Sequence, residues 1–245
     1  MFVADLTSDV TVAVLPLGAT EYHGPHLPLT TDALIADGIL DHAAALDRAS
    51  AKILRLPTVM IGASAEHADR PGTQSIEPET LIAQIVATGE TLAGAGIKRI
   101  VLFNGHGGNV AAASIAALKL RTQFAMLAAS AHWLDFGLPP QMKHPAPPMG
   151  DVHGGWIETS VLMHMDAAHV KGNPGASEAI TPAPSLYPSG PIAWGWMTSD
   201  MVPGGWIGRP DLAQAALGAA MIDHAAQKLL KLIQELAAAP WDKVR

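Results

Sequence analysis

The chain of 245 residues contains no cysteine, so it can form neither a disulfide nor a metal site built on thiolates. Any metal ion must then be held by histidines and carboxylates, of which there are 11 and 22. The chain also lacks a cluster of basic residues, and 15 Lys and Arg against 22 Asp and Glu give a net charge of −7. Nucleic acid is not expected as a partner, because binding it requires basic residues along the phosphate backbone.

Long apolar runs are also missing, since Asp, His, Arg or Pro interrupts every stretch before it reaches the roughly 20 residues that cross a bilayer. The first ten residues, MFVADLTSDV, lack the basic and apolar regions of a secretory signal. We therefore expect a soluble, cytoplasmic protein without a membrane partner. An apolar content of 49% and a charged content of 15% exclude disorder, and the length favours a single domain over residues 1–245.

Short segments rich in Val, Ile and Leu alternate with helical patterns along the chain, which is typical of an α/β fold with a mainly parallel sheet. Predicted strands cover residues 11–17, 52–61, 99–103 and 124–131, and predicted helices cover 31–46, 78–95, 110–122 and 210–238. The proline-rich segments 138–150 and 174–191 are predicted to be loops. Such long loops are either rims of a pocket or irregular packing.

A first cluster of polar residues follows the first predicted strand, in LPLGATEYHGPHLPLTTD (residues 15–32). Glu21 and His23 are two positions apart, so in an extended segment both side chains leave on the same side and can converge on one ion. Asp32 comes at the start of the next helix, where it is either a metal ligand or a helix N-cap. His26 is either a further member of the cluster or an ordinary surface histidine.

A second motif, RIVLFNGHGGN (residues 99–109), is a buried strand that runs into a glycine-rich turn. Its glycines let the backbone bend around His106, at the carboxyl edge of the sheet where ligands bind in open α/β folds. A phosphate-binding loop is the competing interpretation. It fits poorly because neither phosphate-loop pattern is present and no Lys or Arg is nearby.

A third motif, GDVHGGWIETS (residues 150–160), places Asp151, His153 and Glu158 around paired glycines before a helical stretch. Glu158 either points back into a site or only complements the helix dipole. A hydrolase with a nucleophilic side chain is disfavoured, since there is no cysteine and neither Ser64 nor Ser160 lies in a G-x-S-x-G pattern.

These three motifs, in this order, resemble the creatininase (creatinine amidohydrolase) family. The segment GASAEHADRPGT (residues 62–73) is similar to a loop of that family, as is the region of Trp133, and the resemblance spans roughly residues 11–170. It implies a three-layer Rossmann-like sandwich that holds two divalent metal ions, Zn, Mn or Fe. It also implies hydrolysis of a C–N bond in a small-molecule amide, and a homo-oligomer, commonly a hexamer.

The resemblance also assigns roles. Glu21 and His23 would bind different metal ions, Asp32 would bridge the two ions, and His106 would be a further ligand. His153 would be the proton shuttle, with an ordinary imidazole pKa near 6.5, and Asp151 would orient it. The residues expected to contact substrate are Glu66, Thr73 and Trp133, and further pocket walls are expected from the tryptophans at 156, 194, 196 and 206 unless these belong to the core.

One departure concerns the second motif, because creatinine-hydrolysing members have a glutamate ligand where this chain has Gly108. Glu158 is the nearest replacement, and Gly150 stands where those members have a tryptophan. We therefore expect a more open site and a substrate other than creatinine. The alternatives are a peptidase-like member that trims a small modified-peptide precursor and, in another class, a metal-binding protein without catalysis.

Overall fold

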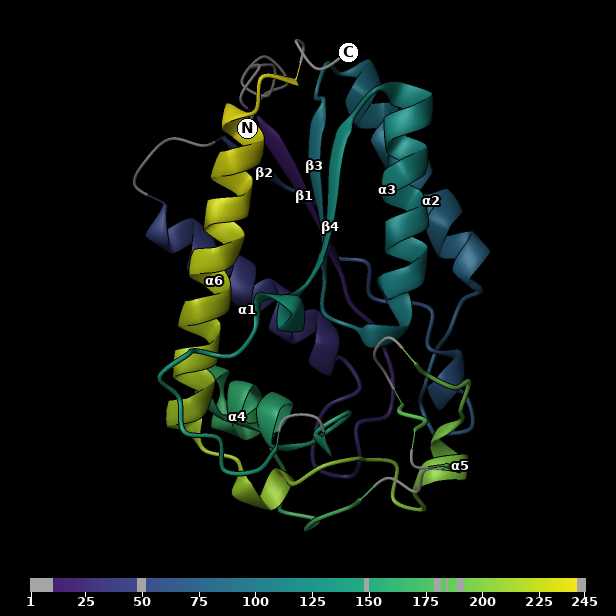
Figure 1. Ribbon diagram of the computed structural model, residues 1–245, viewed down its shortest axis with the longest axis vertical. Coiled ribbons are helices and arrows are strands. Elements are labelled where there is room, and N and C mark those ends of the chain that lie inside the picture. Colours follow the sequence, from purple (N-terminus) through teal and green to yellow (C-terminus); the bar gives the residue numbers. More distant parts are fainter. Residues whose placement is uncertain are drawn as a thin grey trace.

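Figure 1 shows the computed structural model, which describes residues 11–47, 52–147, 150–178, 182–183, 185–188 and 192–241. Residues 1–10, which were considered for a secretory signal, and parts of the two proline-rich segments lie outside these residues. Strands and helices alternate in the first half: β1 (Val12–Leu17), α1 (Thr31–Leu46), β2 (Ile53–Arg55), α2 (Pro78–Gly94), β3 (Arg99–Asn104), α3 (Val110–Phe124) and β4 (Leu127–His132). The later helices are α4 (Trp156–Met165), α5 (Thr198–Met201) and α6 (Ala215–Ala238).

The four strands form one parallel sheet in the order β2-β1-β3-β4. Val12 of β1 is in register with Ile53 of β2 on one side and with Arg99 of β3 on the other. The chain therefore moves outward from β1 to β2 and returns to the opposite side of β1 for β3. Ligands of open α/β sheets bind beyond the carboxyl ends of the strands at such a reversal, which here lies between β1 and β3.

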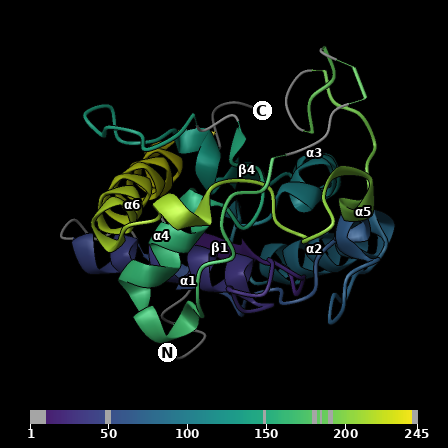
Figure 2. The ribbon, with the colours of Figure 1, turned by 90° about the horizontal axis from the view of Figure 1, so that it is seen from below.

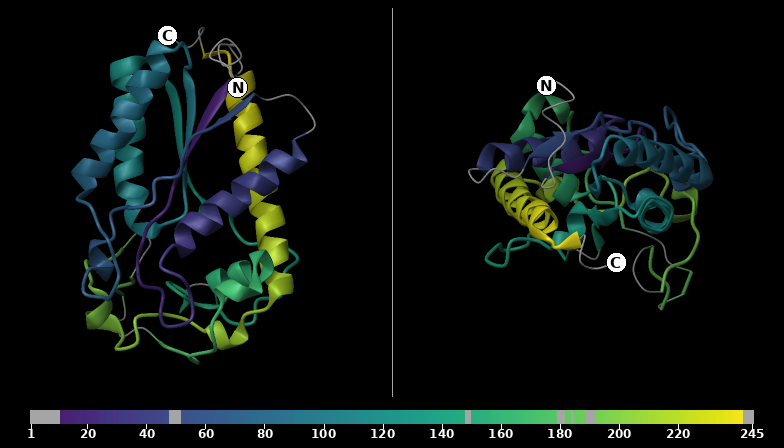
Figure 3. Two further views of the ribbon diagram at one scale, coloured as in Figure 1. Left: turned by 180° about the vertical axis from the view of Figure 1, so that it is seen from behind. Right: turned by 90° about the horizontal axis from the view of Figure 1, so that it is seen from above.

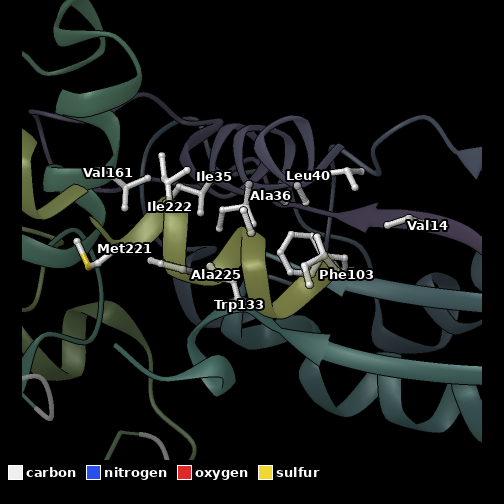
Figure 4. Packing of buried hydrophobic residues seen from close by; sticks show 14 of the residues in the cluster. Val14, Ile35, Ala36, Leu40, Phe103, Trp133, Val161, Met221, Ile222 and Ala225 are labelled. Carbon is white, nitrogen blue, oxygen red and sulfur yellow. The ribbon is translucent and has the colours of Figure 1, made fainter. Parts of the chain in front are cut away.

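Helices cover both faces of the sheet, with α1 and α6 on one side and α2 and α3 on the other (Figures 1 and 3). Side chains alternate along each strand, so Val14 and Phe103 pack toward α1 and α6, whereas Leu15 and Leu102 pack toward α2 and α3. Figure 4 shows the first of these two cores. The predicted α/β fold with a parallel central sheet is confirmed.

The bounds of β2, β4 and α6 differ from the predicted ones for local reasons. β2 is only three residues long, because Pro57 has no N–H for a longer ladder, and Val59 rejoins the sheet as a single bridge to Leu17. The predicted strand from residue 124 begins at 127, since Ala125 takes a left-handed conformation that ends α3. The last helix begins at Ala215, after a short 3-10 turn.

The four strands of the sheet run downward in Figure 1, so their carboxyl ends form the lower edge of the sheet. Figure 2 views the molecule from that side. The segment with α4 lies across this edge, and α4 is fixed by close contact with α6. A Cβ on Gly218 of α6 would lie 2.0 Å from the Ser160 carbonyl oxygen, so only glycine permits this approach. None of the helices in the described residues is long and apolar enough to cross a membrane.

Candidate metal centre

The backbone after β1 is held by hydrogen bonds that direct Glu21 and His23 into one space. The Tyr22 N–H donates to the Thr73 hydroxyl at 3.1 Å, which holds the segment between the two side chains. Glu21 Oε1 lies 3.8 Å from His23 Nε2, and both side chains are fully buried. The spacing-based prediction that they converge is consistent with this geometry. Thr73 thus holds the backbone of this segment through its hydroxyl oxygen.

Asp32, in the first turn of α1, turns its carboxylate toward histidines. Its Oδ1 lies 3.2 Å from His23 Nε2, and its Oδ2 lies 3.4 Å from His106 Nδ1. This close approach depends on Gly105, where a Cβ would lie 2.3 Å from the Asp32 carbonyl oxygen. The glycine-rich turn after β3 therefore brings His106 directly beside the segment after β1.

Glu158 reaches the same space from the first turn of α4. Its Oε2 accepts the Gly154 N–H at 2.6 Å, and its Oε1 lies 3.9 Å from His23 Nε2. The carboxylate is therefore directed back toward the centre, as one of the two sequence interpretations proposed. His26, the open case in the first motif, is buried, and its Nε2 donates to the Gly154 carbonyl oxygen at 3.0 Å.

Asp151 does not orient His153, which corrects the role expected from sequence. Its two oxygens accept the N–H groups of Trp156 and Ile157 at 2.8 Å, and one of them also accepts the Arg209 N–H at 3.3 Å. Asp151 therefore caps the start of α4, where the helix dipole favours a negative charge. Burial nevertheless raises its pKa, despite these three hydrogen bonds.

The histidines share one arrangement, in which one ring nitrogen is hydrogen-bonded to a main-chain oxygen and the other faces a carboxylate. His23 Nδ1 donates to the Glu21 carbonyl at 3.0 Å, and His106 Nε2 to the Ala63 carbonyl at 3.1 Å. His153 Nε2 donates to a carbonyl at 2.7 Å. Metal-binding histidines are characteristically fixed in this way, because the outer bond sets the tautomer and leaves the inner lone pair free.

Carboxylates and burial shift the pKa values in opposite directions. Burial alone would lower the pKa of His23, but the carboxylates of Asp32, Glu158 and Glu21 outweigh it and raise the pKa to about 10. His106 is likewise raised well above the ordinary value against the effect of burial. Burial raises the pKa of Glu158 to about 7. The carboxylates therefore attract positive charge, and bound metal ions would displace these protons.

Burial and the nearby His23 charge lower the pKa of His153 well below 6.5. The expectation of an ordinary value near 6.5 is therefore wrong for this ring. Its Nδ1 lies 3.6 Å from Glu21 Oε1 and carries the free lone pair of the neutral ring.

Four sets of three ligand atoms occur among the described residues. Two contain Glu21 without Asp32, together with His23 and His153 or with Glu66 and His67, and the other two share Asp32. Of the two that share Asp32, one is drawn from Glu21, Asp32 and His106 and the other from His23, Asp32 and Glu158, and within each set the atoms lie within 4.8 Å of one another. Both Glu21 oxygens and Asp32 Oδ2 are buried without a hydrogen-bond partner among the described residues. Unpaired buried carboxylates are costly, and divalent cations that accept N and O ligands would fit them.

The sequence profile of the creatininase family, described as creatinine amidohydrolase, matches residues 2–233. The chain belongs to the creatininase family. The resemblance seen in the three motifs is thus confirmed, and the chain is a creatininase-family hydrolase.

Two curated relatives differ in their stated activity. A Mycobacterium tuberculosis protein named mycofactocin precursor peptide peptidase is 36% identical over 241 residues, which are 93% of this chain and 88% of the relative. The creatinine amidohydrolase of Pseudomonas putida is 30% identical over 62% of this chain and 63% of its own. The crystal structure of a candidate creatinine amidohydrolase from Bacteroides fragilis has a TM-score of 0.80 and 27% identity, covering 96% of this chain and 92% of that one.

Gly108 of this creatininase-family chain does not leave an open space. A Cβ there would lie 2.2 Å from the Ala63 carbonyl oxygen and 2.5 Å from Glu66 Oε1. The turn that carries Glu66 therefore fills the region, and Glu66 Oε1 lies 3.4 Å from His106 Nε2. The expected opening is wrong at this position. At Gly150, by contrast, a Cβ would meet nothing within 4 Å.

Trp133 is a core residue, which corrects its assignment to substrate contact. It is 2% exposed and packs in the core with Phe103, as Figure 4 shows, and Trp156 belongs to the same cluster. The proline-rich segments do line a cavity, of about 380 Å³, with contributions from Pro147 and Tyr187. Gly150 and Asp151 line it as well, so it begins beside the third motif.

Sequence reasoning missed His67 and Thr198. His67 is buried, its ring stacks on His153 with centroids 3.9 Å apart, and its Nε2 lies 3.5 Å from Glu21 Oε1. Its position next to Glu66 in the sequence was a usable signal for His67. Thr198 lies 131 residues further along the chain, outside every motif, so nothing in the sequence pointed to it.

Proposed function

We propose that this chain is a two-metal hydrolase that cleaves an amide C–N bond. The observation that carries the proposal is the pair of ligand sets that share Asp32, one on each of its oxygens. Two divalent ions held there would polarise a water molecule and the carbonyl that it attacks. Glu21 and His106 would hold one ion, and His23 and Glu158 the other.

His153 is the proposed proton shuttle. Because its Nε2 donates to the Tyr22 carbonyl, Nδ1 keeps a lone pair that faces the centre near Glu21. The lowered pKa makes the ring neutral at neutral pH, so it can accept a proton from the attacking water at Nδ1. It would then pass this proton to the leaving nitrogen, because an amide nitrogen leaves poorly unless it is protonated.

The proposed substrate is a short peptide rather than creatinine, which corresponds to the peptidase alternative considered from the sequence. The Mycobacterium tuberculosis peptide peptidase matches most of this chain, whereas the Pseudomonas putida creatinine amidohydrolase matches 62% of it. The cavity of about 380 Å³ is lined by Gly150 and Asp151, which precede His153 in the third motif, and it has room for more than a small ring. Gly108 lacks the ligand carboxylate of creatinine-hydrolysing members.

Metal binding is tested by elemental analysis of the chain after equilibration with Zn²⁺, Mn²⁺ or Fe²⁺. We expect two tightly bound ions per chain, and Asp32→Ala should lose both because it removes the carboxylate shared by the two sets. Full metal content in this variant would refute the bridging role of Asp32. The control is Asp37→Ala. The Asp37 carboxylate pairs with Arg55 away from the centre, so its removal should leave both ions bound.

Activity is tested by mass spectrometry of a mycofactocin precursor peptide incubated with the metal-loaded chain, with creatinine assayed in parallel. We expect a shortened peptide and little or no creatine. A creatinine kcat/KM of about 10⁴ M⁻¹s⁻¹ or more, within the ordinary enzyme range, would contradict the proposed substrate class. Two bound ions without turnover of any amide would instead favour a metal-binding protein without catalysis.

A further inference from the structure

The two carboxylate oxygens of Glu21 face different histidines. Its Oε2 lies 3.2 Å from His106 Nε2, the nitrogen that also faces the Ala63 carbonyl, whereas Oε1 lies 3.5 Å from His67 Nε2 and 3.6 Å from His153 Nδ1. Oε1 is buried and has no hydrogen-bond partner among the described residues. A buried carboxylate oxygen in this situation requires either a hydrogen-bond donor or a cation.

Thr198 determines which nitrogen of His67 carries the proton. The Thr198 hydroxyl donates its hydrogen to the Glu66 carbonyl at 2.9 Å. The hydroxyl oxygen must therefore accept a hydrogen bond from the N–H at His67 Nδ1, which lies 2.6 Å away. The neutral ring is thus protonated at Nδ1, and the lone pair of Nε2 faces Glu21 Oε1. Two acceptors facing each other repel, unless a cation lies between them.

Glu66 forms a set of ligand atoms with Glu21 and His67 that does not include Asp32. One atom from each of these residues lies within 4.8 Å of the other two. The side chain of Glu66 is 21% exposed, so this set lies nearer to solvent than Glu21, which is fully buried. His67 resembles the other histidines of the centre, because Nδ1 is held by the Thr198 hydroxyl while Nε2 faces Glu21 with its lone pair.

We propose that Glu21 Oε1, Glu66 and His67 form a third position for a divalent cation, with Thr198 as the residue that positions His67. The proposal rests on the proposed function only in that Glu21 is shared with the two-metal centre. The third ion binds more weakly than the other two. Two divalent ions already balance the four negative charges of Glu21, Asp32, Glu66 and Glu158, so a third ion meets no net negative charge and is repelled by the two ions beside it.

The test is equilibrium dialysis of the full chain against increasing Mn²⁺, with bound manganese counted by elemental analysis. We expect two tight ions and a third at higher concentration, and His67→Gln and Glu66→Gln should each remove only the third. His224→Gln is a matched control, because this ring binds the Phe136 carbonyl away from the centre. Circular dichroism shows whether each variant is folded. If His67→Gln does not fold, Glu66→Gln provides the test.

Thr198 provides a second, independent readout. Thr198→Val removes the hydroxyl at nearly constant shape, and Thr198→Ser retains it. We expect Thr198→Val to weaken the third ion about 10–100-fold, the usual effect of removing the partner of a ligating histidine, and Thr198→Ser to leave it unchanged. Nitrogen NMR of labelled His67 should show the proton on Nδ1 in the wild type, and a shift of Nε2 when diamagnetic Zn²⁺ fills the third position.

Three outcomes would overturn the proposal. The first is saturation of the wild type at two ions, with His67→Gln giving the same isotherm. The second is loss of one of the two tight ions in His67→Gln, since His67 would then belong to the principal centre. The third is a proton on Nε2 of His67. Failure of the two-metal proposal gives a different result, because the wild type would then bind fewer than two tight ions or Asp32→Ala would keep both.

Discussion

Replacing Asp151 by alanine should destabilise the fold by about 3 kcal/mol, because its carboxylate accepts the two N–H groups that begin α4 at 2.8 Å. Leaving a buried N–H without an acceptor costs about 1–3 kcal/mol, and the variant leaves two such groups. The variant also recovers part of the cost of burying the charge, which is the cost that raises the pKa of Asp151. The estimate therefore lies in the lower half of the summed range of about 2–6 kcal/mol.

The backbone packs closely around the carboxylate of Asp151. A Cβ on Gly155 would lie 1.9 Å from Asp151 Oδ1, and one on Gly208 would lie 2.4 Å from the same oxygen, so the chain is packed tightly around the carboxylate. Asp151→Asn keeps one oxygen acceptor at the same place and should lose less stability than Asp151→Ala. The loss of α4 capping should also loosen Glu158, which lies in the first turn of the same helix.

The assay is urea unfolding of the metal-free chain, followed by circular dichroism at constant pH. Asp166→Ala is the control, because Asp166 caps an exposed 3-10 turn through the Ala168 N–H at 2.9 Å and should cost about 1 kcal/mol or less. The capping assignment is refuted if Asp151→Ala unfolds with an unchanged free energy. An unchanged stability with a shifted pH profile of kcat would restore the role of orienting His153.

Three further predictions follow from the same geometry. Gly108→Glu should add no metal ion and should cost about 1–3 kcal/mol in urea unfolding, since its Cβ meets the Ala63 carbonyl; an extra tight ion would contradict this. His153→Asn should keep two tight ions and lower kcat by about 10²–10⁴, whereas loss of an ion would make His153 a ligand. Burial lowers the pKa of His26 to about 4, so its neutral form contributes stability that is complete above pH 6.5 and declines as the pH falls toward 4. His26→Gln should flatten the pH dependence of unfolding over that range, and an unchanged slope would show that His26 is not buried neutral.

The sequence by itself was sufficient for the fold class, and it singled out the residues of the first two motifs that the structure brings together. Alternating strand and helix patterns predicted the parallel sheet, and the observed strand order places the ends of β1 and β3 side by side. The two-residue spacing of Glu21 and His23 was informative because both side chains turn into the same space, and such local geometry depends on a few neighbouring residues. His106 was predictable from a buried strand that runs into a glycine-rich turn.

Only the tertiary structure decided what the remaining side chains face. Asp151 and Glu158 are close in sequence, yet one caps α4 and the other turns toward His23, because the packing of α4 against α6 sets the direction of each. Glu66 fills the space beside Gly108, which lies 42 residues further along the chain. His67 bonds to Thr198 across a separation of 131 residues. Such contacts leave no periodic signal in the sequence, since they depend on how separate elements pack rather than on local backbone preference.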